Sequence, residues 1–149
     1  MKICLDSSVL IAHLGGDSLA RDIIVKIVRG EWEGFINPIV ASETMIGFLR
    51  LATGVSAGRI RDRLSKSDPE LLGYLPRVLG LLELFENLPI RATPQELVNT
   101  MTSYSLMPND ALIAITCRHH GVSHIATFDK DFDRVPWLTM VPGTRQPTR

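Results

Sequence analysis

The segment that most constrains the fold runs from Pro108 to Phe132 and combines a helix, a tight turn and a strand. Asn109 is placed to cap the helix. Asp110 then falls in its first turn, where exposed N–H groups and the helix dipole favour an acid. Gly121 stands where a helix C-terminal glycine belongs, and the strand candidate His124–Thr127 follows it. The segment therefore predicts a helix–turn–strand unit that has carboxylates at both ends.

Short apolar runs alternate with helical patterns along the rest of the chain. The expected strands are Lys2–Leu5, Gly34–Ile36, Leu88–Ile90, His124–Thr127 and Trp137–Val141. The proline in the third of these predicts a position at a sheet edge. The alternation predicts a three-layer α/β/α domain with a mainly parallel central sheet of about five strands. We expect a single domain over residues 1–141 and a flexible tail over residues 142–149.

Charge and hydrophobicity narrow the class of partner. The chain has 149 residues, 45% of them hydrophobic, and a formal net charge of zero from 16 basic and 16 acidic residues. If four acids serve a metal site, twelve acids face sixteen bases, and the remaining surface is mildly basic and compatible with nucleic-acid binding. No apolar run is long enough to cross a bilayer, and Asp6 comes too early for a secretory signal. We therefore expect a cytoplasmic protein with no membrane partner.

Two acids have alternative interpretations. Asp6 ends the first apolar run, and it is either the N-cap of the next helix or a metal ligand. Glu43 lies four residues after Ile39 and three before Ile46, so it shares or borders the apolar face of its helix. It either points inward to a metal or lies at the edge of that face, where it can pair with Arg50.

The positions of the acids predict a cation site. Asp6, Asp110 and Asp129 each stand at a strand end or a helix start, and ligands bind outside the C-terminal ends of strands in open α/β sheets. Carboxylates that converge repel one another unless a divalent cation lies between them. The oxygen-rich set favours Mg²⁺ or Mn²⁺ over zinc, and such cations support hydrolysis of a phosphodiester. No Ser-His-Asp spacing, P-loop or dinucleotide fingerprint competes with this interpretation.

Four short motifs resemble those of PIN-domain ribonucleases, and they occur in that family's order. They are Asp6-Ser7-Ser8-Val9-Leu10-Ile11, Val40-Ala41-Ser42-Glu43, Asn109-Asp110-Ala111-Leu112-Ile113-Ala114 and Ala126-Thr127-Phe128-Asp129-Lys130-Asp131-Phe132. The size and single-domain build are similar to the VapC-type toxins of toxin–antitoxin pairs.

The resemblance implies a Mg²⁺- or Mn²⁺-dependent endoribonuclease that forms a homodimer and is inhibited by a small VapB-like antitoxin. It implies that Asp6, Glu43, Asp110 and Asp129 are the catalytic, metal-binding acids, and that Asp6 and Asp110 hold the cation most directly. It also implies that Thr127 or Ser8 assists through a hydroxyl. Asp131 is the alternative to Asp129 as the fourth acid.

Two other functions remain compatible with the sequence. A PIN-type nuclease in RNA maturation or decay would have the same site without an antitoxin. In a non-catalytic interaction module the acids would be caps and surface groups. The leucine-rich helix that begins at Asp68-Pro69 would then supply part of a binding surface.

Overall fold

The sheet of the computed structural model, which describes residues 1–143, has five parallel strands in the order β3-β2-β1-β4-β5. The strands are β1 (Lys2–Leu5), β2 (Glu33–Ile36), β3 (Glu86–Asn87), β4 (His124–Ala126) and β5 (Thr139–Val141). In register, Cys4 faces Phe35 on one side and Ile125 on the other, so β1 is buried between two neighbours. The predicted three-layer α/β/α fold with a parallel central sheet is confirmed.

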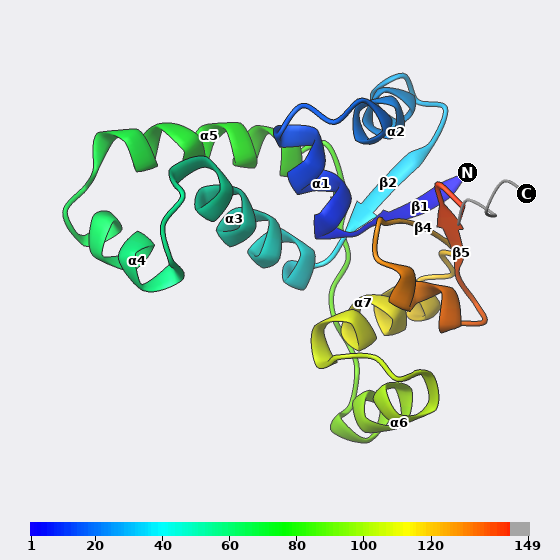
Figure 1. The fold of residues 1–149 in the computed structure, drawn as a ribbon. Helices are drawn as coiled ribbons and strands as arrows, with labels where there is room; N and C mark the ends of the chain where they lie inside the picture. The colour runs from blue at the N-terminus through cyan, green and yellow to red at the C-terminus, as the bar shows by residue number, and fades with distance from the viewer. Residues whose placement is uncertain (144–149) are drawn as a thin grey trace, which may run out of the picture.

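Seven α-helices and one short 3-10 helix connect the described strands. They are α1 (Ser7–Leu14), α2 (Ser18–Val28), α3 (Pro38–Thr53), α4 (Ala57–Ser65), α5 (Pro69–Leu82), α6 (Pro94–Tyr104), α7 (Pro108–His119) and η1 (Lys130–Arg134). Figure 1 shows α2 above the strands, α6 and α7 below them, and α4 and α5 extending away from the sheet beyond α3. No helix in the described part of the chain is long and apolar enough to span a membrane.

The hydrophobic core has two parts. The larger part surrounds the sheet and includes Ile3, Leu10 and Ile125, each fully buried. The smaller part joins α3, α4 and α5 through Leu49, Ile60 and Leu71. Burial of these side chains anchors the projecting helices to α3, the helix that carries Glu43.

One polar contact ties α3 to α7. Asn37 caps α3 by accepting a hydrogen bond at Oδ1 from Val40 N, as the Asn37-Pro38 pair predicts. Its Nδ2 donates to Thr116 Oγ1 of α7 at 3.1 Å, and both side chains are buried. Because buried polar groups are costly to leave unpaired, this bond specifies how the two helices meet.

Several boundaries differ from the sequence-based expectation. The edge strand is Glu86–Asn87 and not Leu88–Ile90, because the ladder with β2 ends once Leu88 N has bonded to Ile36 O and Pro89 has no N–H to continue it. The last strand begins at Thr139, after a turn in which Leu138 N donates to Val135 O. The predicted tail, residues 142–149, lies outside the described residues from position 144 onward.

Candidate active site

The strand order of the sheet reverses between β1 and β4. The chain moves from β1 to β2 and β3 on one side of the sheet, and then returns to place β4 and β5 on the other side. Ligands bind at such a reversal of strand order, outside the carboxyl ends of the strands. Asp6 follows β1 directly and Thr127 follows β4 directly, and Asp6 N donates to Ala126 O at 2.9 Å. The two strand ends therefore present their next side chains to the same space.

Asp6 is both a helix cap and a member of the group of side chains at this reversal. Its Oδ1 accepts from Ser7 N at 2.9 Å, which caps α1. Its Oδ2 accepts from Ser8 Oγ at 2.7 Å and from Thr127 Oγ1 at 2.8 Å. Burial raises the pKa of Asp6, and these three hydrogen bonds oppose the rise. The two interpretations offered by the sequence are therefore not exclusive.

The two hydroxyls also hold the loop that follows β4. Thr127 Oγ1 accepts from Asp129 N at 2.9 Å, and Ser8 Oγ accepts from Phe128 N at 3.1 Å. Each hydroxyl therefore donates to Asp6 and accepts from a backbone N–H of the loop. This chain of bonds fixes the position of Asp129 relative to Asp6.

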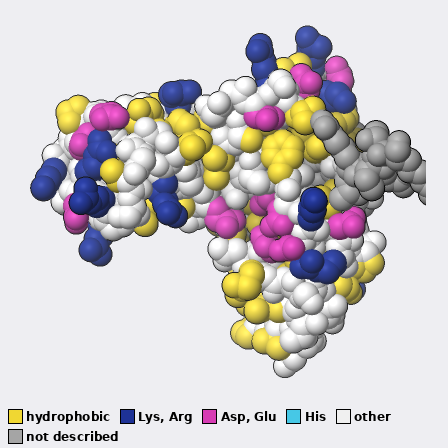
Figure 2. Space-filling model, in the orientation of Figure 1, with side chains coloured by type: hydrophobic (Ala, Val, Ile, Leu, Met, Phe, Trp, Pro, Cys, Tyr) yellow, Lys and Arg dark blue, Asp and Glu magenta, His cyan; other side chains and the backbone are white. Residues whose placement is uncertain are grey.

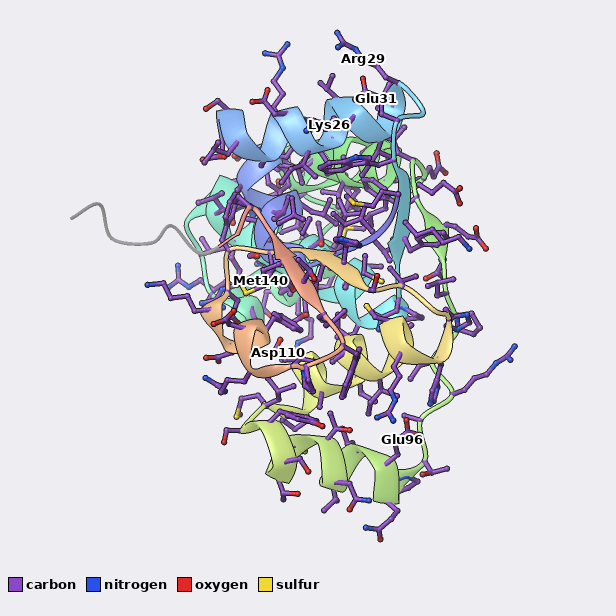
Figure 3. All side chains as sticks on the ribbon, turned by 90° about the vertical axis from the view of Figure 1, so that its right-hand side faces the viewer. Lys26, Arg29, Glu31, Glu96, Asp110 and Met140 are labelled. Atoms are coloured by element: carbon purple, nitrogen blue, oxygen red, sulfur yellow. The ribbon has the colours of Figure 1, made fainter. Side chains whose placement is uncertain are left out.

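Three carboxylates form the tightest group on the rim. Asp110, Asp129 and Asp131 each offer an oxygen, and these oxygens lie within 4.8 Å of one another. Asp110 comes from the first turn of α7, and Figure 3 shows it at the start of that helix, beside the segment that follows β4. Asp129 caps η1 by accepting from Asp131 N at 2.9 Å. Asp131 also pairs with Arg134 at 3.2 Å.

The pKa of Asp110, a member of this group, is shifted. Burial, and after it the charge of nearby acids with Asp6 first among them, together raise the pKa of Asp110 from 3.8 to about 6. The other three contributors are Asp129, Glu43 and Asp131. Like charges that lie this close disfavour ionisation of one another, and a bound cation relieves this repulsion.

Glu43 faces the acids from α3. It is half-buried, and its Oε1 finds no hydrogen-bond partner among residues 1–143. Burial and then Asp6 raise the pKa of Glu43, and the side chain of Asn109 partly offsets that rise. The described residues contain no ion pair between Glu43 and Arg50. A buried oxygen without a partner is a plausible ligand atom.

The acids proposed from sequence thus gather on one rim in two groups. Asp110 and Asp129 belong to the tight group together with Asp131, the residue that the sequence left as an alternative. Asp6 and Glu43 are close enough to this group for their charge to raise the pKa of Asp110. Figure 2 shows the resulting concentration of Asp and Glu side chains where α3 meets the body of the protein.

Two residues of the site escaped the sequence reasoning. Asn109 does not cap α7, because the helix begins at Pro108 with Met107 as its N-cap and no side-chain cap bond, and Asn109 lies instead near Glu43. Arg134 binds Asp131 and also donates to the Tyr104 and Ser105 carbonyls, which fastens η1 to the end of α6. The i,i+3 spacing of Asp131 and Arg134 was the available signal for that pair.

The donor set fits a hard divalent cation. The tight group offers carboxylate oxygens alone, and Glu43 adds a buried oxygen without a partner. Oxygen ligands of this kind suit Mg²⁺ or Mn²⁺. His119 is engaged elsewhere, in a 2.7 Å contact with Glu96 of α6, which Figure 3 shows at the far end of the helix pair.

Comparisons with known proteins agree with this geometry. The model of the PIN domain family matches residues 3–138. Ribonuclease VapC2 of Methanocaldococcus jannaschii is 38% identical over 94% of this chain and 93% of its own length. Two solved structures share the fold. FitAcB from Neisseria gonorrhoeae has a TM-score of 0.65 and 18% identity, and the match covers 93% of this chain and 95% of that one. VapBC2 from Rickettsia felis, bound to a DNA fragment from the promoter, has a TM-score of 0.57 and 18% identity, and the match covers 94% of this chain and 97% of that one. The chain belongs to the PIN domain family.

Proposed function

We propose that this protein is a Mg²⁺- or Mn²⁺-dependent endoribonuclease and the toxin of a VapBC-type toxin–antitoxin pair. The observation that carries the proposal is the 38% identity to Ribonuclease VapC2 over nearly the whole of both chains. The rim of acids at the strand-order reversal supports it independently, because that is where an α/β sheet binds ligands.

Asp6, Glu43, Asp110 and Asp129 would hold the cation, and Asp131 would add a further carboxylate to the group. When bound, such a cation neutralises charge on a phosphodiester and lowers the pKa of a coordinated water. Ser8 and Thr127 orient Asp6 through Oδ2 and so set the position of its carboxylate.

The raised pKa values of Asp110 and Glu43 predict that the protein releases protons when it binds a divalent cation. Both acids hold a proton more firmly than ordinary carboxyls, and a cation displaces it. Cation affinity should therefore rise as the pH passes about 6, the pKa of Asp110.

The resemblance to toxin-antitoxin structures supports a proposal for the protein partners of this chain. A solved structure described as a toxin-antitoxin complex from Klebsiella pneumoniae resembles this chain in fold, with a TM-score of 0.60 and 19% identity. We propose a small VapB-like antitoxin as the inhibitor, a homodimer as the active form, and action in the cytoplasm. The exposed outer face of α5, which includes Leu72 and Leu79, offers apolar surface for an interface.

Cleavage of a mixed pool of single-stranded and structured RNA tests the proposal. Purified protein is assayed with Mn²⁺, with Mg²⁺ and with EDTA, beside the variants Asp6→Asn and Asp110→Asn. Asp133→Asn is the matched control, because Asp133 is exposed on η1 and forms no ion pair or side-chain hydrogen bond with the described residues. Cleavage that requires metal, fails in both site variants and persists in the control supports the proposal. Cleavage in EDTA, or by Asp110→Asn at the wild-type rate, contradicts it.

The antitoxin half is tested separately. A small protein encoded beside this gene should bind the purified chain and suppress cleavage in proportion to its concentration. Cleavage that no such protein inhibits would favour a PIN-type nuclease of RNA maturation or decay.

A further inference from the structure

A hollow of about 440 Å³ lies between α2, β5 and the segment that follows β4, and the roles described above leave it unused. Its lining includes Leu19 of α2, Met140 of β5, Thr127 and Phe128 of the loop after β4, and Lys130 at the start of η1. Phe128 and Lys130, which line the hollow, are the two chain neighbours of Asp129, and Thr127 donates to Asp6, so the segment that borders the hollow also carries part of the candidate active site. Figure 2 shows hydrophobic side chains that border the acidic cluster toward α2.

Phe128 is an exposed aromatic residue on a backbone that is tied on both sides. Its side chain is 39% exposed, whereas Phe132, four residues later, is fully buried. Phe128 N donates to Ser8 Oγ at 3.1 Å, and Thr127 N donates to Val141 O at 3.0 Å. Together with the bond from Asp129 N to Thr127 Oγ1, these contacts hold the loop so that the ring stays at the surface.

The position of the ring suits a base that flanks the reacting phosphate. Consecutive Cα atoms are about 3.8 Å apart, so Phe128 begins one residue from Thr127 and one from Asp129. A phosphodiester bound at the acids would place an adjoining nucleoside beside this loop. Single-stranded bases stack on exposed aromatic rings, and each stack contributes a measurable share of the affinity.

Lys130 supplies the charge that such a strand needs. It is exposed, it lines the same hollow, and it follows Asp129 directly. The acids repel a phosphate backbone, and a cationic side chain beside them offsets that repulsion. Leu19, which is 45% exposed, and Met140 add apolar surface to the lining of the hollow.

We propose that Phe128 stacks on the nucleobase next to the scissile phosphate of a single-stranded RNA, with Lys130 against the phosphate backbone. Phe128 is thereby a residue that determines the nucleotide preference at the cleavage site. The inference rests on the proposed ribonuclease function and adds the substrate contact that the acids themselves do not provide.

The test compares wild type with Phe128→Leu, which keeps an apolar side chain but removes the aromatic face, and with Phe128→Tyr, which restores the face. Val98→Ala is the matched control, because Val98 is an exposed apolar residue on α6, a helix that contributes no residue to this hollow. A random-sequence single-stranded RNA pool is cleaved in Mn²⁺, and the ends are sequenced. KM is measured in parallel, and thermal unfolding checks that each variant is folded.

Phe128→Leu should raise KM between about fivefold and a hundredfold, with a smaller change in kcat, and should flatten the base preference at the position beside the cut. Phe128→Tyr should retain both properties. A Phe128→Leu enzyme that cleaves with wild-type KM and preference overturns the inference and leaves the nuclease standing. A folded, metal-loaded wild type that cleaves no RNA overturns the inference and the proposed function together.

Discussion

Replacing Asp110 with asparagine is expected to make the metal-free protein more stable at alkaline pH. Asp110 lies among four other acids, and burial and their charge raise its pKa from 3.8 to about 6. Asparagine has nearly the same shape and no charge. The variant therefore removes the repulsion without opening a cavity.

The magnitude follows from the shift. A rise of roughly two pKa units corresponds to about 3 kcal/mol if the interaction is unscreened. Asp110 is only half-buried, so solvent screening reduces this to about 1–2 kcal/mol. For a chain of this length that change raises Tm by about 3–6 °C.

The pH dependence has a defined sign. The folded state binds the Asp110 proton more tightly than the unfolded state, so the stability of the wild type falls as the pH rises from about 4 through about 6. Asp110→Asn lacks this loss. The two proteins should be equally stable near pH 4 and differ fully above pH 7.

Urea unfolding in EDTA at pH 4.5 and pH 8 measures the difference. Asp133→Asn serves as the control and should stay within about 0.5 kcal/mol of wild type at both pH values. An Asp110→Asn variant that is no more stable than wild type at pH 8, or that is equally stabilised at both pH values, would refute the electrostatic reasoning.

Three further predictions concern stability. Thr127→Val removes a buried hydroxyl that bonds Asp6 Oδ2, and should lower the free energy of unfolding by about 1–3 kcal/mol in urea melts; an unchanged value would mean that the bond contributes nothing. Gly34→Ala places a Cβ 2.7 Å from Phe85 Cδ1 in the core, and should lower the free energy of unfolding by about 1–3 kcal/mol. An unchanged free energy of unfolding would show that the Phe85 ring moves aside at no cost. Gly80 lies inside α5, and an added Cβ would have nothing within 4 Å. Gly80→Ala should therefore raise the free energy of unfolding by about 0.5–1 kcal/mol, and a decrease would contradict the conclusion that the position has room for a methyl group.

The alternation of apolar runs with helical patterns was sufficient for the fold class and for the places of β1, β2, β4 and β5 along the chain. Asn37 and Thr93 each precede a proline and cap α3 and α6, as the general preference for a capping residue followed by proline at a helix start predicts. The edge strand β3 was misplaced because Glu86 and Asn87 are exposed and polar, so an apolar pattern could not mark them. Strand pairing depends on tertiary contacts, so the sequence of a two-residue edge strand contains little information about where the strand lies.

The details of the site depend on contacts between distant segments. The sequence placed Asp129 ahead of Asp131, yet both join Asp110 in the tight group, because the η1 turn points their carboxylates the same way. The unpaired Oε1 of Glu43 depends on how α3 meets α7, which the buried Asn37–Thr116 bond specifies. A helical pattern alone gives no such orientation.

The most direct test of the central claim, that acids from both sides of the sheet reversal hold one cation, is a calorimetric Mn²⁺ titration of wild type, Asp6→Asn, Asp110→Asn and Asp133→Asn at pH 7.5. We predict saturable binding by wild type and Asp133→Asn, with affinity lost or greatly weakened in both site variants. Binding that survives unchanged in Asp6→Asn or Asp110→Asn, or no binding by wild type, would contradict the claim.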